Sequence, residues 1–538
     1  MDALPIGGEL NPSLAKPKEL MMTQGILRRL MKWALWEWAI FLVVVVLAGF
    51  AALYLKRWVL FPFPLEYREA VSIELAQAML RGINPFTVGQ FPEFMYVYGL
   101  LYIFAVLPLV HLVSPMILAP RIVSAISLAV ALIAFLWTLR MRGASLLESM
   151  VAALILGLAA CMVLSINGAR PDMAGLMFML LGLFFVSKFH FNVLSLVACA
   201  FCGLGAFYTK QYLAFPFVFL VVYLFLFQAK RKALLYGGIL LGLGVLTYLP
   251  VRLYYPLYWR YAVLHHINAY GGTQEHMLDQ VWDFLAWFWA ICIYYVYYLH
   301  RRYFIPDKGS NPSRHFDLAN WRKPLVTSLD VDLCDFLLVA NALILVFLMG
   351  QEQGNNETYF LELLLPFLLM AVIPSIGFYL RRGWVRGLIL AGFLTSAIPL
   401  SPIFETPFSI YVQNYRELVD VLNHCDSIYA TPLLAGYLMD RGISPIYGGP
   451  ETEYGYTVVS THGSRLLQVL VGGNDDALAK RWQDWNTAIK TRIVEGQFDC
   501  VALSNNSLAN FHYHVISVAP NVAGWTVQVW VPNRGQSQ

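Results

Sequence analysis

The sequence contains few charged side chains, and this scarcity limits the class of protein that it can encode. Only 13% of the 538 residues are Asp, Glu, Lys or Arg, whereas soluble domains carry about 25%. Hydrophobic residues make up 59% of the chain, and the mean hydropathy is +0.59. So few charges cannot cover a water-facing surface of this size, and the composition indicates that much of the surface faces lipid.

The sequence also lacks the patterns that are typical of nucleic-acid binding, of metal sites and of a signal peptide. The net charge of +4 comes without a long basic tract, so nucleic acid is not expected as a partner. The seven cysteines show no CxxC spacing, so no zinc or iron–sulfur site is predicted. The sequence names no cofactor, and a divalent metal ion is kept as an option. The first 32 residues lack the apolar core and cleavage site of a signal peptide, and we expect residues 1–32 to form a cytoplasmic N-terminal segment.

Long apolar runs recur along the chain, beginning with an anchor at 33–55. Each is close to the roughly 20 residues that cross a bilayer. With the anchor they make eleven candidate spans: 33–55, 121–139, 149–166, 172–189, 192–209, 211–228, 232–252, 279–299, 333–349, 359–380 and 385–403. The predicted fold class is therefore a polytopic α-helical membrane protein of about eleven transmembrane helices.

A further run, 98–117, is ambiguous, and the distribution of Lys and Arg decides its status. If this run does not cross, all the cationic clusters between spans fall on the cytoplasmic side, as the positive-inside rule requires. These clusters are at 140–142, 188, 230–232, 301–323 and 381–386. The loop 56–120 and the residues after about 404 then lie on the periplasmic side. We predict a multi-pass protein of a bacterial inner membrane in this orientation.

Residues 410–538 differ in composition from the membrane part. Helices are expected near 413–424, 433–440 and 476–494, and strands at 427–432, 444–448, 498–504 and 525–532. This alternation predicts a small, separately folded periplasmic α/β domain. Cys425 and Cys500 lie at predicted strands in an oxidising compartment, so they either form a disulfide or stay two separate thiols.

Ionisable side chains beside the apolar runs are costly to place in lipid and therefore mark candidate functional sites. Glu66, Arg68 and Glu69 lie in the stretch EYREA, at the start of a predicted amphipathic helix at the membrane interface. The two carboxylates either take part in catalysis or form an ordinary solvated pair with Arg68.

Two further motifs carry cations. In SINGARPDMAG, Asp172 is expected to cap the following helix, and Arg170 is a side chain suited to phosphate. In FYTKQYLAF, Lys210 and Gln211 interrupt two apolar runs. Lys210 either meets a phosphate or extends toward the interface as an ordinary snorkelling lysine.

A fourth motif, NNETYFLEL, contains Asn356, Tyr359 and Glu362. Glu362 lies one helical turn into the following span and should face a cavity or a cation rather than lipid. On the predicted topology all four motifs share the periplasmic face. A carboxylate there can act as general base on an acceptor hydroxyl, and Arg and Lys can stabilise the charge that develops on a phosphate leaving group.

The same motifs resemble those of the bacterial GT-C superfamily of polytopic glycosyltransferases. EYREAVSIELAQAMLRGINPF is similar to the family's first outer loop, of the form (D/E)-Y-x-E-G followed by an interfacial helix, with Ala70 where the family has Gly. ARPDMAG, YTKQY and NETYFLEL resemble its RPD, TKQ and NYFLE stretches in the same order, with Glu357 and Thr358 added in the last. The similarity covers residues 33–405, the GT-C-like transmembrane domain, and not the tail.

The resemblance implies an inverting transferase related to protein mannosyltransferases and lipid A aminoarabinose transferases. It implies a polyprenyl-phosphate-linked sugar as donor, with a lipid, glycan or protein as acceptor. By position, Glu69 and Glu66 match catalytic residues, and Arg170, Lys210 and Gln211 match donor-phosphate-binding residues. The supporting residues are Arg68, Asp172, Asn356, Tyr359 and Glu362. The alternative is a transporter or flippase of a lipid-linked glycan, which would distribute polar residues along the spans.

Overall fold

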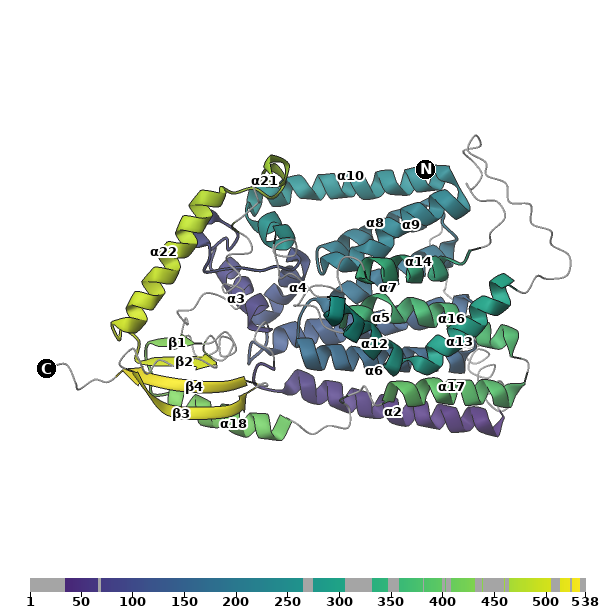
Figure 1. Cartoon of the computed structure of the whole chain (residues 1–538), viewed down its shortest axis with the longest axis horizontal. Coiled ribbons are helices and arrows are strands. Elements are labelled where there is room, and N and C mark those ends of the chain that lie inside the picture. The colour runs from purple at the N-terminus through teal and green to yellow at the C-terminus, as the bar shows by residue number, and fades with distance from the viewer. Residues whose placement is uncertain are drawn as a thin grey trace, which may run out of the picture.

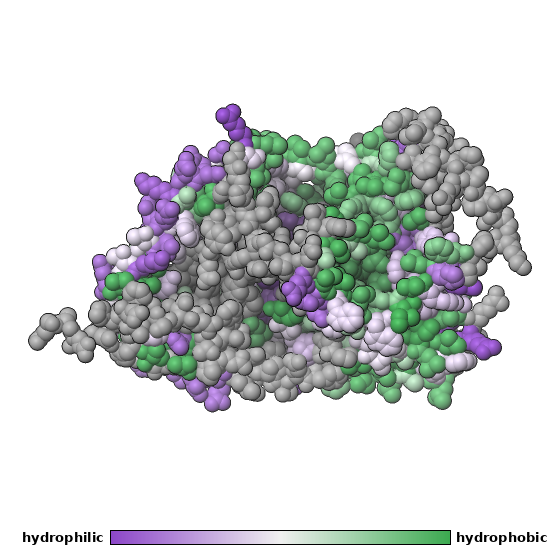
Figure 2. Space-filling model, viewed as in Figure 1, coloured by the Kyte–Doolittle hydropathy of each residue, from purple (hydrophilic) through white to green (hydrophobic). Residues whose placement is uncertain are grey.

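The computed structural model describes residues 34–65, 69–264, 274–304, 331–346, 358–380, 382–398, 402, 408–430, 438, 459, 464–504, 513–522 and 525–532. Long helices lie side by side in one body, and a smaller unit that contains a sheet lies at one end of it (Figure 1). On the face shown in Figure 2, apolar residues cover much of the helical body, and hydrophilic residues gather over the smaller unit. This distribution agrees with a lipid-facing body.

Every predicted span is helical in the described residues. The helices are α2 (Leu35–Leu60), α5 (Leu118–Met141), α6 (Leu146–Asn167), α7 (Asp172–Phe189), α8 (Val193–Phe207), η2 (Gln211–Ala214), α9 (Phe215–Tyr223), η3 (Leu224–Gln228), α10 (Lys230–Tyr254), α12 (Gln274–Trp287), α13 (Trp289–Leu299), η5 (His300–Phe304), α14 (Leu333–Ile344), α15 (Thr358–Leu363), α16 (Leu365–Tyr379) and α17 (Gly383–Ala397). Within the part of the chain that the structure describes, six segments are long and apolar enough to cross a membrane, namely α2, α5, α6, α7, 211–228 and α10. The chain is thus a polytopic helical membrane protein, and the count of eleven crossings stays a prediction.

Burial differs among these helices according to their place in the body. α6 is apolar on all sides and lies in the centre, where most of its residues are buried. α2 and α10 lie at the edge and point Leu42, Leu53, Leu241 and Leu246 outward. Because these exposed apolar side chains would be unstable in water, their position fits helices that contact lipid on one side.

Two short helices, α3 (Glu69–Leu80) and α4 (Leu100–Val110), lie at the end of the body next to the smaller unit (Figure 1). α4 has 11 residues and rises about 16 Å, roughly half the thickness of the bilayer core. It cannot cross alone, which agrees with the prediction for 98–117. α3 begins at Glu69 as predicted, but it is not a one-sided interfacial helix, because Val71, Ile73 and Leu75 are all buried in protein.

The tail forms a four-stranded sheet in the order β1-β2-β4-β3. β1 (Ile428–Ala430) runs parallel to β2 (Cys500–Ser504), and β4 (Trp525–Pro532) is antiparallel to β2 and to β3 (Tyr513–Val522). With α18 (Phe408–Leu422) and α22 (Asp475–Val494), these elements confirm the predicted helices near 413–424 and 476–494 and three of the predicted strands. β3 was not predicted. The predicted helix near 433–440 and strand at 444–448 lie outside the described residues, apart from residue 438.

The structure decides between the two states of the tail cysteines, because Cys425 and Cys500 form a disulfide. It also adds contacts between the tail and the membrane part. Phe61 and Phe63, which follow α2, share a buried cluster with Tyr415 and Leu418 of α18. The rings of Phe63 and Tyr415 are stacked with centroids 4.7 Å apart. The tail therefore completes part of the core at this end of the body.

Candidate functional site

Glu69, the first residue of α3, is fully buried and forms an ion pair with Arg121 of α5. The guanidinium binds both carboxylate oxygens, with Nη2 at 2.8 Å from Oε2 and Nε at 3.2 Å from Oε1. The backbone N–H groups of Leu65 and Ala169 donate to Oε2 and Oε1 at 2.7 and 2.8 Å. Each oxygen thus accepts two hydrogen bonds, so Glu69 joins α3 to α5, to the segment after α2 and to the loop before α7.

Arg121 is the residue that the sequence analysis missed. Its remaining N–H groups donate to the carbonyl oxygens of Trp58 at 3.1 Å, of Phe63 at 2.7 Å and of Phe61. All five guanidinium N–H groups are therefore used, and they hold the chain where it leaves α2. The signal was available, because Arg121 is a lone cation within the apolar stretch LAPRIVSAIS and such residues are rarely without a role.

The loop between α6 and α7 is held closely against the Glu69 carboxylate. Gly168 has a φ of 62°, and a Cβ atom at this position would lie 2.5 Å from Cγ of Glu69. A side chain here would therefore strain the backbone and collide with the carboxylate. From the other side, the Tyr102 hydroxyl lies 2.9 Å from the carbonyl oxygen of Ala169 and 3.0 Å from that of Pro120. The position of this loop is fixed by both contacts.

This loop brings Arg170 and Asp172 to Lys210, as the motifs predict. Lys210 Nζ donates to Asp172 Oδ1 at 2.6 Å, and Arg170 Nε lies 3.8 Å from Asp172 Oδ2. All three side chains are at least nine-tenths buried. The ring of Tyr98 faces both cations, with its centroid 4.9 Å from Lys210 Nζ and 5.6 Å from Arg170 Cζ. The result is a compact cationic group at the end of the spans.

One prediction about a single residue needs correction, and one open alternative is decided. Asp172 does not cap α7, because α7 begins at Asp172 itself and Pro171, which occupies the N-cap position, makes no side-chain capping bond. Its carboxylate accepts instead from Lys210 and from Asn167 Nδ2 at 3.0 Å. The bond from Lys210 joins two opposite charges inside the protein, whereas a capping bond joins the carboxylate to a neutral donor. For the same reason Lys210 does not extend toward the interface.

Glu362 in α15 faces the same group, as predicted. Its carboxyl adjoins that of Asp172, and Oε2 accepts a hydrogen bond from the Tyr212 hydroxyl. Glu362 Oε1 and Asp172 Oδ2 are buried with no hydrogen-bond donor among the described residues. Buried acceptors of this kind lower stability unless a proton shared between the two carboxyls, a ligand or a cation satisfies them. A hydroxyl group of a ligand could donate to either oxygen.

The remaining predicted residues divide into two groups. The ring of Tyr359 lies 4.4 Å from that of Tyr212 and 5.6 Å from Lys210 Nζ, so it borders the cationic group. Gln211 Nε2 donates to the carbonyl oxygen of Val97 at 2.9 Å, which ties it to the segment before α4. Glu66, Arg68 and Asn356 lie outside the described residues. Within the described ranges, no group of three or more His, Cys, Asp or Glu side chains could hold a metal ion.

A second buried polar cluster lies at the other end of α5. Arg121 and Arg142 are separated by 21 residues, about 31 Å along a helix. Arg142 Nη2 pairs with Asp332 Oδ1 at 2.7 Å. Nearby, Asp335 accepts hydrogen bonds from the hydroxyls of Tyr298 and Tyr303, both at 2.8 Å. Here both carboxylate oxygens of Asp335 are used, because Tyr295 also donates to it at 3.3 Å.

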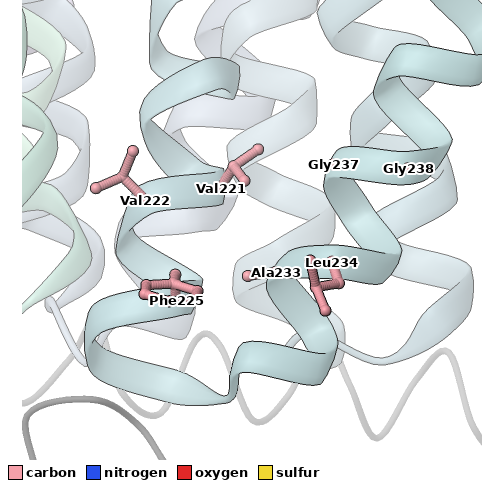
Figure 3. A pocket seen from close by; sticks show the side chains of 7 residues that line it. All are labelled: Val221, Val222, Phe225, Ala233, Leu234, Gly237 and Gly238. Atoms are coloured by element: carbon pink, nitrogen blue, oxygen red, sulfur yellow. The ribbon is translucent and has the colours of Figure 1, made fainter. Parts of the chain in front are cut away.

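A surface groove of about 290 Å³ between α9, η3 and α10 offers no comparable chemistry (Figure 3). It is lined only by apolar side chains and glycine: Val221, Val222, Phe225, Ala233, Leu234, Gly237 and Gly238. With no charged or hydrogen-bonding side chain, this groove can hold hydrocarbon but cannot carry a reaction. The candidate site is therefore the group around Lys210 and Asp172.

No protein-family model matches the chain, and a search of curated proteins finds no match. Two crystal structures of ArnT from Cupriavidus metallidurans are similar to it. The apo structure has 15% sequence identity and a TM-score of 0.52, and the match covers 91% of this chain and 98% of that one. The structure bound to undecaprenyl phosphate has 14% identity and a TM-score of 0.50, covering 90% and 97%. The chain therefore shares the polytopic helical fold of these two ArnT structures.

Proposed function

We propose that this chain is a glycosyltransferase of the bacterial inner membrane. It moves a sugar from a polyprenyl-phosphate donor to a lipid, glycan or protein acceptor at the periplasmic face, with inversion. The observation that carries the proposal is the buried group of Arg170, Lys210, Asp172 and Glu362 at the end of the spans. A neighbour of the same fold has been crystallised with undecaprenyl phosphate, which supports a lipid-linked phosphate as the ligand.

The chemistry assigned to this group follows from its charges. The acceptor oxygen attacks the anomeric carbon of the donor sugar while a carboxylate takes the proton of the acceptor hydroxyl. The bond between that carbon and the phosphate oxygen breaks, and polyprenyl phosphate leaves with one more negative charge. Arg170 and Lys210 are suited to stabilise this charge, since fixed cations in a dry site act strongly on developing charge. The two unsatisfied carboxyl oxygens are suited to accept sugar hydroxyls.

We assign the general-base role to Glu66 and a positioning role to Glu69. Both oxygens of Glu69 already accept two hydrogen bonds each. A substrate hydroxyl could reach this carboxylate only by displacing Arg121 or a backbone N–H group. Glu66 is the other carboxylate of the acidic motif, three residues earlier. In this assignment Glu69 keeps the loop 168–171 in place, and through that loop it orients Arg170.

The tail supports the proposed orientation of the chain in the membrane. The α/β unit lies at the same end of the body as α3 and α4 (Figure 1), and it contains the Cys425–Cys500 disulfide. Disulfides persist in the bacterial periplasm and are rare in the cytosol. This supports a periplasmic position for the tail, and with it for the candidate site.

The test is a comparison of envelope glycans by mass spectrometry. Cells that express the wild-type chain, no chain, the Glu66→Gln variant or the Arg142→Met variant would be compared, with the amount of membrane-inserted protein measured in each. We expect one sugar to disappear without the chain and with Glu66→Gln, and to be retained with Arg142→Met. Disappearance of an entire glycan from the outer face would instead favour the flippase, and an unchanged profile without the chain would contradict the proposal.

A further inference from the structure

The short helix α21 (Arg465–Val471) is apolar on more than one side. Val471 is buried and Leu467 partly buried in a cluster that also contains residues of α10. On the other side, Leu466 and Val469 are each 72% exposed and Leu470 is 47% exposed. A helix of a water-soluble unit would place polar residues there, so the composition of α21 does not fit a surface that faces water.

The position of α21 explains this composition. The Tyr248 hydroxyl of α10 donates to the backbone carbonyl oxygen of Leu470 at 2.7 Å. Tyr248 precedes Tyr254, the last residue of α10, by six residues, or about 9 Å along the helix axis. α21 therefore lies beside the candidate span rather than beyond its end, as Figure 1 shows for the two helices.

The exposed side of α21 continues the lipid-facing surface of α10. Leu249 and Leu253 of α10 are 57% and 70% exposed, in the same part of the helix as Tyr248. We infer that α21 inserts into the membrane leaflet on the side of the candidate site, with Leu466, Val469 and Leu470 in contact with lipid. Amphipathic helices of this kind lie about 5–10 Å deep, at the boundary between head groups and acyl chains, and the position of α21 near the end of α10 suits that depth.

Polar contacts at the end of α21 mark the return to the membrane surface. A Cβ atom on Gly472, directly after α21, would lie 2.2 Å from Arg252 Nη2, so the guanidinium touches this residue. Buried Arg260 donates to the Gly472 carbonyl oxygen at 2.6 Å and pairs with Asp475 Oδ1 at 2.7 Å. Arginine near the end of a span places its charge at head-group level. These contacts connect the inserted helix to the start of α22.

Insertion of α21 also fixes α22 relative to the site. Arg481 of α22 donates to the carbonyl oxygen of Phe91 at 2.5 Å and to that of Gly89. Both carbonyls belong to the segment that follows α3. Besides its packing against Phe61 and Phe63, the tail is thus held by lipid at α21 and by backbone carbonyls at α22.

Spin labels at single introduced cysteines test the inference in the full chain. Leu466→Cys and Val469→Cys would be labelled in liposomes of phosphatidylethanolamine and phosphatidylglycerol, with Thr487→Cys, on the exposed side of α22, as control. The signal of the unmodified chain, which has five free cysteines among the described residues, is subtracted. We expect labels at 466 and 469 to collide more with oxygen, which concentrates in lipid, than with a water-soluble nickel chelate, and the label at 487 to show the reverse.

Two results would overturn the inference. More collisions with the nickel chelate at 466 and 469 would place α21 in water. Few collisions with either reagent would mean that protein covers this side. Because the measurement reads depth and not turnover, its outcome is independent of the proposed sugar transfer.

Discussion

The two buried polar clusters at opposite ends of α5 use the same kinds of side chain in different ways. At one end, Asp335 accepts hydrogen bonds from three tyrosine hydroxyls. At the other end, Asp172 Oδ2 and Glu362 Oε1 are buried with no donor among the described residues. An unsatisfied buried acceptor lowers stability unless a shared proton or a ligand satisfies it. The comparison teaches that the first cluster is saturated with hydrogen bonds, whereas the cluster around Lys210 keeps two acceptor oxygens that a ligand could use.

The same distinction separates the carboxylates of Glu69 and Glu362. Glu69 has four donors and is saturated, whereas Glu362 has one unsatisfied oxygen. Saturation indicates that Glu69 holds the surrounding backbone in place. The predictions below test this division from the largest expected change in stability to the smallest.

The largest loss of stability is expected for Arg121→Met. This substitution leaves the buried Glu69 carboxylate without its counter-ion, which typically costs about 3–5 kcal/mol. Thermal unfolding of the purified protein in detergent should show a large fall in the melting temperature. The double variant Glu69→Leu with Arg121→Met should recover part of the loss, because no charge is left unpaired. If Arg121→Met left the melting temperature unchanged, the ion pair would not stabilise the fold.

An intermediate loss of stability is expected when Cys425 and Cys500 are both replaced by Ser. The disulfide closes a loop across a separation of 75 residues, and bonds of this kind contribute about 2–4 kcal/mol. Hydrogen exchange should become faster in β1 and β2, which the disulfide joins, with little change in α5 to α7. Equal protection in the two forms would show that the disulfide adds nothing to the packing and hydrogen bonds that hold the tail.

The smallest loss of stability is expected for Arg142→Met, at the opposite end of α5. Arg142 and Asp332 are each 18% exposed, so water stabilises the aspartate that remains. Pairs between exposed side chains contribute about 0.2–1 kcal/mol, and we expect this partly exposed pair to lie near the upper end of that range. The melting temperature should fall slightly, and sugar transfer per folded molecule should stay at the wild-type level. If Arg142→Met lowered sugar transfer as much as a substitution in the group around Lys210, the two ends of α5 would not differ in function.

The sequence predicted the helices well, because a run of about 20 apolar residues has few alternatives to a helix in lipid. It also predicted that Arg170, Lys210 and Glu362 converge, since these residues interrupt or border such runs. β3 escaped prediction because its sequence, YHVISVAPNV, contains Pro520, which argues against a central strand. The structure accommodates it by a register irregularity between Ala519 and Val522.

The partners of the site residues could not be predicted from spacing. Glu69 and Arg121 are 52 residues apart, and only the packing of α3 against α5 brings them together. The cap predicted for Asp172 was wrong for a similar reason, since local sequence does not reveal that Lys210 lies within reach. Burial of both groups makes the long-range pair stronger than the local bond.

The central claim is that the group around Lys210 carries sugar transfer, and one comparison tests it most directly. The rate at which the affected sugar appears in envelope glycans would be measured for Lys210→Met and for Arg142→Met, per amount of folded protein. Loss of one preorganised cation typically lowers the rate about 10²- to 10³-fold. We predict a loss of this size for Lys210→Met and a wild-type rate for Arg142→Met. A wild-type rate for Lys210→Met in folded protein would contradict the account.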